Sequence, residues 1–276
     1  MLLAMLLSAH PGIGIVRDSR GNVYYTDLKQ VWKLTPDGTK SVAVPGVHTH
    51  ELWMSPGDTL YGEHLWYDAG GSNPWMHRIW RRTPDGQVAD LIPARRGVRE
   101  DFGDAFFVRD RSGAMYWADR GTVTAIKKRS VDGKVSVVAR SRFTNVRHMT
   151  VADDGTLYLI DMYDVVIIPP GDTPRTLARG IARYGATAPL FSKEYAVMGI
   201  WSDGRGSIYA AVPSDSCVKR IDAQGSVMTL YKADARWLPV GGTAGPDGSH
   251  CILEFFDNDT VRVVRVDADG RKHVRR

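Results

Sequence analysis

Val16-Arg17-Asp18-Ser19-Arg20-Gly21-Asn22-Val23-Tyr24-Tyr25-Thr26-Asp27 is the stretch of sequence that decides the fold. It combines an aspartate, a glycine turn, a hydrophobic residue followed by tyrosine, and a closing aspartate. The turn and the tyrosine recur along the chain, which is typical of a repeat architecture. Five clear copies and a degenerate sixth copy lie at Gly21–Tyr24, Gly57–Tyr61, Gly113–Tyr116, Gly155–Tyr158, Gly206–Tyr209 and Gly248–Leu253.

A second turn follows each copy at a similar interval. Dividing 276 residues among six units gives about 46 residues for each unit. In the third unit, β-like stretches at 106–108, 115–118, 123–126 and 134–138 are separated by turns rich in Asp, Ser and Gly, as hairpins require. The second turns are Pro36–Gly38, Pro84–Gly86, Asp132–Gly133, Pro170–Asp172, Ala223–Gly225 and Asp267–Gly270.

This repeat predicts an all-β fold, a six-bladed β-propeller of four-stranded antiparallel blades that forms a single domain over residues 1–276. No stretch has a sustained helical period with caps. Two segments compete for the outer strand that completes the sixth blade. Leu2–Leu6 has the right phase to close the ring, and Lys272–Val274 also has the pattern of an outer strand.

Composition excludes several classes of protein. The chain has 36 Lys and Arg against 31 Asp and Glu, a net charge of +5 that is mild for its length and argues against nucleic acid binding. Its longest apolar stretch, Met1–Leu7, is too short for a membrane span. Cys217 and Cys251 cannot build a disulfide framework. We expect a soluble monomer, with the cellular compartment left open.

The candidate site lies where innermost strands begin, at one mouth of the central channel. His50 and His148 have the same position in the second and fourth units, and Asp104 precedes the strand between them. Imidazoles and a carboxylate are ligands of zinc, manganese and iron, and carboxylates also bind calcium. We therefore predict a divalent metal at His48, His50, Asp104 and His148, with no nucleotide cofactor because no phosphate-binding loop is present. The alternative is that these histidines line a solvated channel.

The second unit carries further candidates. Glu63 and His64 follow its tyrosine and add possible catalytic groups, and Glu51 is another polar group nearby. The segment 66–75 contains Trp66, Tyr67 and Trp75 with Gly, Asn and Pro, a composition that suits a loop facing a ring-shaped ligand. The alternative is that its tryptophans pack onto neighbouring blades.

The repeats resemble those of the NHL propellers, whose blade motif matches Val16 through Asp27 and, in the third and fourth units, stretches ending at Asp119 and Asp161. The peptidyl-hydroxyglycine amidating lyases look like six-bladed NHL propellers that hold zinc with three histidines. This resemblance implies zinc at His50 and His148, although Gly241-Gly242 stands at the third position. It also implies catalytic roles for Arg120 and Tyr163. The gluconolactonase propellers begin their metal site with Glu-Gly-Pro, where this chain has His10-Pro11-Gly12. This difference argues against a gluconolactonase site.

Together these features predict a ligand site for a small molecule or glycan at the channel mouth. The expected activity is that of a metal-assisted lyase or hydrolase. The alternative is a non-catalytic propeller that binds a protein, a peptide or RNA through its face.

Overall fold

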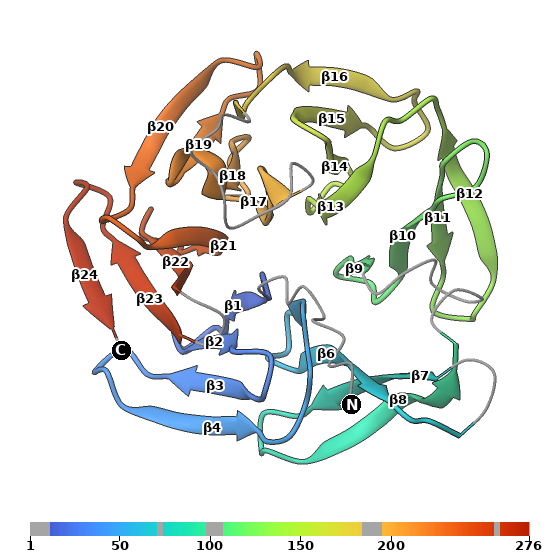
Figure 1. The fold of residues 1–276 in the computed structure, drawn as a ribbon, viewed down its shortest axis with the longest axis horizontal. Helices are drawn as coiled ribbons and strands as arrows, with labels where there is room; N and C mark the ends of the chain where they lie inside the picture. Colours follow the sequence, from blue (N-terminus) through green and yellow to red (C-terminus); the bar gives the residue numbers. More distant parts are fainter. Residues whose placement is uncertain (1–11, 71–73, 98–106, 184–194, 257–259, 276) are drawn as a thin grey trace, which may run out of the picture.

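The computed structural model describes residues 12–70, 74–97, 107–183, 195–256 and 260–275. These residues form six four-stranded sheets, which we number as blades I to VI. Figure 1 shows the six blades arranged around a central axis, with β4, β8, β12, β16, β20 and β24 on the outside. The predicted all-β six-bladed propeller is confirmed.

Each blade consists of four consecutive strands. Blade I contains β1 (Ile15–Arg17), β2 (Val23–Thr26), β3 (Val31–Leu34) and β4 (Lys40–Val44). Blade II contains β5 (Leu52–Met54), β6 (Leu60–Tyr67), β7 (Trp75–Arg82) and β8 (Val88–Arg96). Blade III contains β9 (Phe107–Arg109), β10 (Met115–Asp119), β11 (Ala125–Arg129) and β12 (Val135–Arg140).

The second half of the chain repeats this order. Blade IV contains β13 (Val146–Val151), β14 (Leu157–Asp161), β15 (Asp164–Ile168) and β16 (Arg175–Ala178). Blade V contains β17 (Ile200–Ser202), β18 (Ile208–Val212), the short 3-10 helix η2 (Pro213–Asp215), β19 (Cys217–Ile221) and β20 (Val227–Lys232). Blade VI contains β21 (Leu238–Ala244), β22 (His250–Phe256), β23 (Thr260–Val266) and β24 (Lys272–Arg275). Within the described ranges, no helix has the length and apolarity of a membrane span.

Hydrogen bonds explain why the repeated motif needs its aspartate and its tyrosine. The Asp110 carboxylate accepts the backbone N–H groups of Ser112 and Ala114, at 2.9 and 3.0 Å, and the Tyr116 hydroxyl at 2.9 Å. Asp203 does the same in blade V and accepts the Tyr209 hydroxyl at 3.1 Å. The motif therefore fixes the turn between the first two strands of a blade.

Glycine in this turn is required by the backbone. Gly155 and Gly206 have φ values of +84° and +93°, in the region that residues with a side chain adopt only with strain. The prediction that both glycines lie in turns is confirmed.

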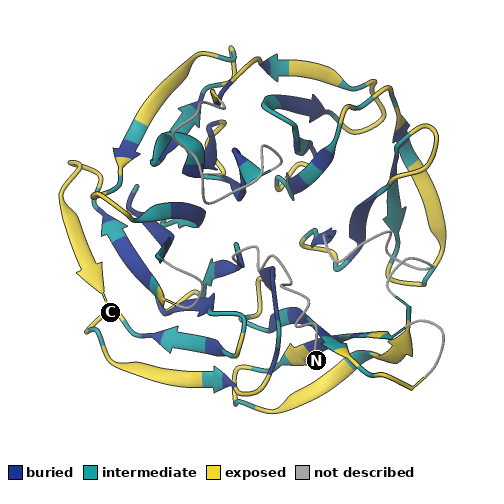
Figure 2. Ribbon diagram, in the orientation of Figure 1, coloured by how far each residue is buried: buried dark blue, intermediate teal, exposed yellow. Residues whose placement is uncertain are grey.

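The core lies between the blades, in the middle strands. Figure 2 shows the inner and middle strands mainly buried and the outermost strands largely exposed. Trp80 and Trp117 are buried there, as expected, and Trp53 of blade II stacks on Phe107 of blade III with ring centroids 4.4 Å apart. Trp32 is only partly buried and donates its indole N–H to Asp27 at 2.8 Å. Blade faces packed on one another hold the ring together.

The ring closes between blade VI and blade I without a shared strand in the described residues. β24 pairs with β23 and is the outer strand of blade VI, so the C-terminal candidate is the one that the structure supports. The competing segment, Leu2–Leu6, lies outside the described residues. Arg17 bridges the two blades by an ion pair with Asp247 at 3.7 Å. The backbones also approach closely, since a Cβ placed on Gly241 would lie 2.1 Å from the Ile13 carbonyl oxygen.

Candidate functional site

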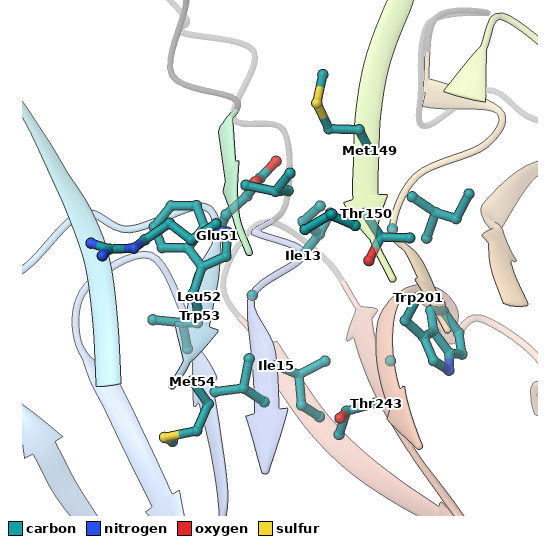
Figure 3. A pocket seen from close by; sticks show the side chains of 18 residues that line it. Ile13, Ile15, Glu51, Leu52, Trp53, Met54, Met149, Thr150, Trp201 and Thr243 are labelled. Carbon is teal, nitrogen blue, oxygen red and sulfur yellow. The ribbon is translucent and has the colours of Figure 1, made fainter. Parts of the chain in front are cut away.

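The central channel contains a cavity of about 210 Å³ that all six blades line. Figure 3 shows its wall, in which Ile13 and Ile15 of blade I and Leu52 of blade II are typical apolar members. Glu51 and Arg109 are the titratable groups among the described lining residues. We call the end of the channel at which the innermost strands begin the entry end. Glu51 immediately precedes β5 and therefore lies at this end.

His50 forms a pair with Glu63 beside the entry end. The imidazole Nδ1 lies 3.3 Å from the Glu63 carboxyl oxygen Oε1. The same oxygen accepts the backbone N–H groups of His50, at 2.5 Å, and of Glu51, at 3.3 Å. A single carboxyl group of β6 thus holds the segment that carries both His50 and Glu51.

Glu51 forms a second pair, with His148 of blade IV. Its Oε1 lies 3.6 Å from the Nδ1 of His148. Figure 3 shows Glu51 on one side of the cavity and Met149 and Thr150, which follow His148 in β13, on the other. The pair therefore joins blades II and IV across the channel. The sequence predicted His50 and His148 as partners in one site, and the group that contacts His148 here is Glu51, the neighbour of His50.

These four side chains are buried, with exposed fractions of 5% for His50 and Glu51, 1% for His148 and 0% for Glu63. Histidines that merely line a solvated channel would be hydrated, so the burial favours a built polar cluster over that alternative. We call these four residues the buried His–Glu cluster. Buried polar groups usually need hydrogen-bond partners, and Glu63 meets this need by accepting the backbone N–H groups of His50 and Glu51.

Burial also sets the protonation states of the cluster. It raises the pKa of Glu63 to about 7 and raises the pKa of Glu51 well above its ordinary value, an effect to which the charge of Glu63 adds. It lowers the pKa of His50 to about 3, and nearby His48 contributes to this shift. Burial therefore favours the uncharged acid form of Glu51, and His50 is a neutral imidazole at neutral pH.

The structure brings His48 and His64 next to this cluster. The His48 and His50 ring centroids lie 4.7 Å apart. The His64 Nδ1 accepts the backbone N–H of His48 at 2.8 Å, and its ring stacks on Trp66 at 4.8 Å. His48, His50, Glu63 and His64 thus lie together on blade II, as expected from the sequence.

Arg120 and Tyr163 have other surroundings. The Arg120 guanidinium donates from Nε and Nη2 to the Val146 carbonyl, at 3.1 and 2.5 Å. Tyr163 packs against the core between blades IV and V. Neither residue lines the channel cavity. The catalytic roles implied for them by family resemblance stay predictions, and Asp104 lies outside the described residues.

The aromatic candidates of blade II lie on a long hairpin. The sequence predicted an insertion that interrupts a tight turn, whereas β6 and β7 continue to pair up to Tyr67 opposite Trp75. Tyr67 and Trp75 are 64% and 36% exposed and contact each other edge to face. Because successive residues of a strand point to opposite faces, Trp66 lies on the other face of the hairpin. The three rings therefore do not form one platform.

Metal ligands were predicted at this site. In the parts of the chain that the structure describes, no three His, Cys, Asp or Glu side chains form a group able to hold a metal ion. The donors there occur as His–Glu pairs, and a complete ligand set would need a further group such as Asp104. The metal site stays a prediction.

Sequence reasoning gave no role to Glu51, which the structure makes the acidic group of the cavity. A signal was present, since Glu51 directly follows His50 and alternation along an extended segment sends neighbours in different directions. What the sequence lacked was the partner of Glu51, because His148 is distant along the chain.

Comparison with known proteins identifies the fold and no family. No family model matches the chain, and no curated protein matches it. Solved structures with this fold include the virginiamycin B lyase from Staphylococcus aureus with quinupristin, at 14% identity and a TM-score of 0.56 over 98% of this chain and 86% of that one. They also include a gluconolactonase from Xanthomonas campestris, at 15% identity and a TM-score of 0.60 over 89% and 84%.

A third similar structure is an auxiliary nutrient binding protein from Bacteroides thetaiotaomicron, at 10% identity and a TM-score of 0.64 over 96% of this chain and 69% of that one. The same fold thus occurs in a lyase, a lactonase and a binding protein. At these identities the likeness establishes the propeller fold alone, and the NHL resemblance of the repeats stays a prediction.

Proposed function

We propose that this protein is a lyase or hydrolase that acts on a small molecule, or on one end of a glycan, at the entry end of the channel. The observation that carries the proposal is the position of Glu51, which lines the cavity, has a pKa that burial raises well above its ordinary value, and lies 3.6 Å from the His148 imidazole. Acid–base catalysis needs such a donor and acceptor side by side, with pKa values shifted from the ordinary ones.

In this proposal Glu51 is the general acid. It gives its proton to the leaving group of a substrate that enters the cavity, and His148 stabilises the carboxylate that results. Glu63 is a positioning residue in this proposal, because its carboxyl accepts the backbone N–H groups of His50 and Glu51 and so fixes the segment that carries the acid. A cavity of about 210 Å³ is small for a drug-sized ligand, which favours a compact substrate or a terminal group.

A metal-assisted form of this reaction is the second candidate, favoured by the approach of the His48 and His50 rings to 4.7 Å. A bound zinc, manganese, iron or calcium ion would supply Lewis acidity. The predicted ligands are His48, His50, His148 and Asp104, and Asp104 lies outside the described residues. Elemental analysis of protein purified without a His-tag tests this form. His50→Ala and His148→Ala should each abolish metal binding, with the double variant little worse.

The alternative function is that of a non-catalytic binding module. A nutrient binding protein with the same fold supports this alternative. The cavity wall, which combines apolar side chains with polar groups, suits binding as well as catalysis. As expected from the sequence, we propose a monomer whose ligand is a small molecule or glycan, and not a nucleic acid.

A substrate panel separates the two functions. The panel contains quinupristin, gluconolactone and short glycans, assayed by mass spectrometry for turnover and by calorimetry for binding. For a substrate that is turned over, Glu51→Gln should lose turnover and keep binding, because the amide has the shape of the acid and cannot give up its proton. The control is Asp153→Asn, an exposed residue of the turn after β13. Turnover by Glu51→Gln at the rate of wild type would overturn the acid role, and binding without turnover would favour the module.

A further inference from the structure

The segment that carries His148 is held by an aspartate of its own blade. The two carboxylate oxygens of Asp161, at the end of β14, accept the backbone N–H groups of Thr144 at 3.0 Å and Asn145 at 2.5 Å. The Met162 N–H in turn donates to the Asn145 carbonyl at 3.2 Å. The backbone that leads into β13 is therefore tied down just before it reaches the histidine.

A second contact reaches the same segment from the neighbouring blade. Arg120 follows β10 of blade III, and its guanidinium donates two hydrogen bonds to the carbonyl of Val146. Charge-assisted hydrogen bonds of this kind are stronger than neutral ones, and the planar guanidinium fixes a direction as well as a distance. The carbonyl that it binds lies two residues before His148.

β13 has a bulge at this point. Val146 pairs with Asp161 and His148 pairs with Ile160, so that Arg147 is an extra residue in the strand. A bulge bends a strand and redirects the side chains beside it. Here it directs His148 toward Glu51, two blades away, and the two contacts at 144–146 hold the strand where it is bent.

Among the aspartates at this motif position in blades I, III and IV, Asp161 is the one that contacts the segment before its inner strand. In blade II the same position is His64, whose Nδ1 accepts the N–H of His48 before β5. The same motif position in blade I is Asp27, which accepts the N–H groups of Lys29 and Gln30 in its own hairpin. In blade III it is Asp119, which pairs with Lys127 at 2.5 Å. Asp161 instead turns to the segment before β13.

We propose that Arg120 and Asp161 are positioning residues that act through the backbone of 144–146 to fix the imidazole of His148 against Glu51. The catalytic meaning of this position rests on the proposed function. The geometry itself does not, so it can be tested without a substrate.

The test is NMR of the protein labelled with ¹⁵N-histidine, which reports the tautomer and surroundings of each imidazole. In Arg120→Gln, the side-chain signals of His148 should shift or split, while those of His250 in blade VI stay in place. Arg120→Lys keeps the positive charge and can donate one hydrogen bond to the Val146 carbonyl, so its His148 signals should shift less than those of Arg120→Gln. Guanidinium chloride at a concentration well below denaturing should restore the wild-type signals in Arg120→Ala, because Arg120 is exposed enough for the ion to enter.

The matched control is Arg111→Gln. Arg111 also joins blades III and IV, by an exposed ion pair with Asp153 at 2.5 Å, but at the other end of the channel. It should leave His148 unchanged. If Arg120→Gln fails to fold, Asp161→Asn, which keeps one acceptor, replaces it. Wild-type His148 signals in a folded Arg120 or Asp161 variant, or equal shifts in the Arg111 control, would overturn the proposal.

Failure of the proposed function would look different, since it would leave these shifts in place and remove only the activity. With a substrate in hand, Arg120→Gln should lower kcat by about 100-fold with little change in KM, as expected when a catalytic group is misplaced by about 1 Å.

Discussion

Glu63 is a carboxylic acid enclosed by the protein, and this gives it a measurable effect on stability. Burial raises its pKa from 4.5 to about 7. A pKa that is higher in the folded state gives a contribution that is fully present below pH 4.5 and is lost as the pH rises through 7. The loss corresponds to roughly 3 kcal/mol for this interval of pKa values.

Glu63→Gln removes this titration and keeps an oxygen for the His50 N–H. The free energy of unfolding of the variant, relative to wild type, should therefore rise as the pH goes from about 4.5 to above 7. Urea unfolding at several pH values measures it, with the exposed Asp153→Asn as control. If the free energies of unfolding of the variant and wild type changed with pH in parallel, the prediction would be contradicted.

The tryptophans of blade II should differ sharply in their effect on stability. Trp75 is 36% exposed, whereas Trp80 is fully buried between blades and donates its indole N–H to the Glu63 carbonyl. Trp80→Ala should cost about 3–5 kcal/mol and Trp75→Ala much less. Thermal melts measure both. A large loss for Trp75→Ala would mean that its ring is part of the core and not available to a ligand.

At the scale of single residues, composition alone could not separate these side chains. The sequence places Trp66, Tyr67 and Trp75 in one loop, whereas pairing of β6 with β7 puts Trp66 on the opposite face. The equal positions of His50 and His148 within their blades could be predicted, because the repeat shows which residues precede the innermost strand of each blade. Glu51 could not be assigned, because its role depends on a partner two blades away.

The turns between strands are the elements that the sequence predicted best. Gly206 has a φ of +93°, and a Cβ placed on it would meet no atom within 4 Å, so replacing it costs backbone strain and no clash. Gly206→Val should lower the free energy of unfolding by about 1 kcal/mol or more. Gly57 is the matched control, since it is equally open but has no positive φ. Gly57→Ala should be neutral or slightly stabilising. Chemical denaturation measures both variants, and equal losses at the two positions would contradict this account.

The lengths of the elements were harder to predict. Turn residues mark where a strand must end, and they fixed the ends of most strands within a few residues. In blade II, the composition of 66–75 predicts a loop, whereas cross-strand pairing extends β6 to Tyr67, begins β7 at Trp75 and extends β8 to Arg96. The bulge in β13 could not be predicted either, because the residues of this strand are ordinary for a strand and the contacts beside it come from Arg120 and Asp161, which are distant along the chain.

At the scale of the whole molecule, the interface between blades I and VI should be the first to open. The chain passes from each of the other blades to its neighbour in sequence, whereas the described residues of blades I and VI share no strand and are joined by contacts such as Arg17 with Asp247. Native-state hydrogen exchange should give a lower opening free energy for β1 and β21 than for β9 and β13. Arg17→Gln should lower it further at this interface only. Uniform protection across the inner strands would contradict the prediction.

Because one interface is weaker than the others, the ring can deform by opening at that interface. A ring cut at one place can widen by a small rotation of every segment, and the strain is then spread over all the other joints. Widening the bore of this protein in that way would separate blade I from blade VI, which in the described residues are held by contacts such as Arg17 with Asp247. Access to Glu51 would then depend on the stiffness of the whole ring. A covalent cross-link between blades I and VI would keep the channel narrow.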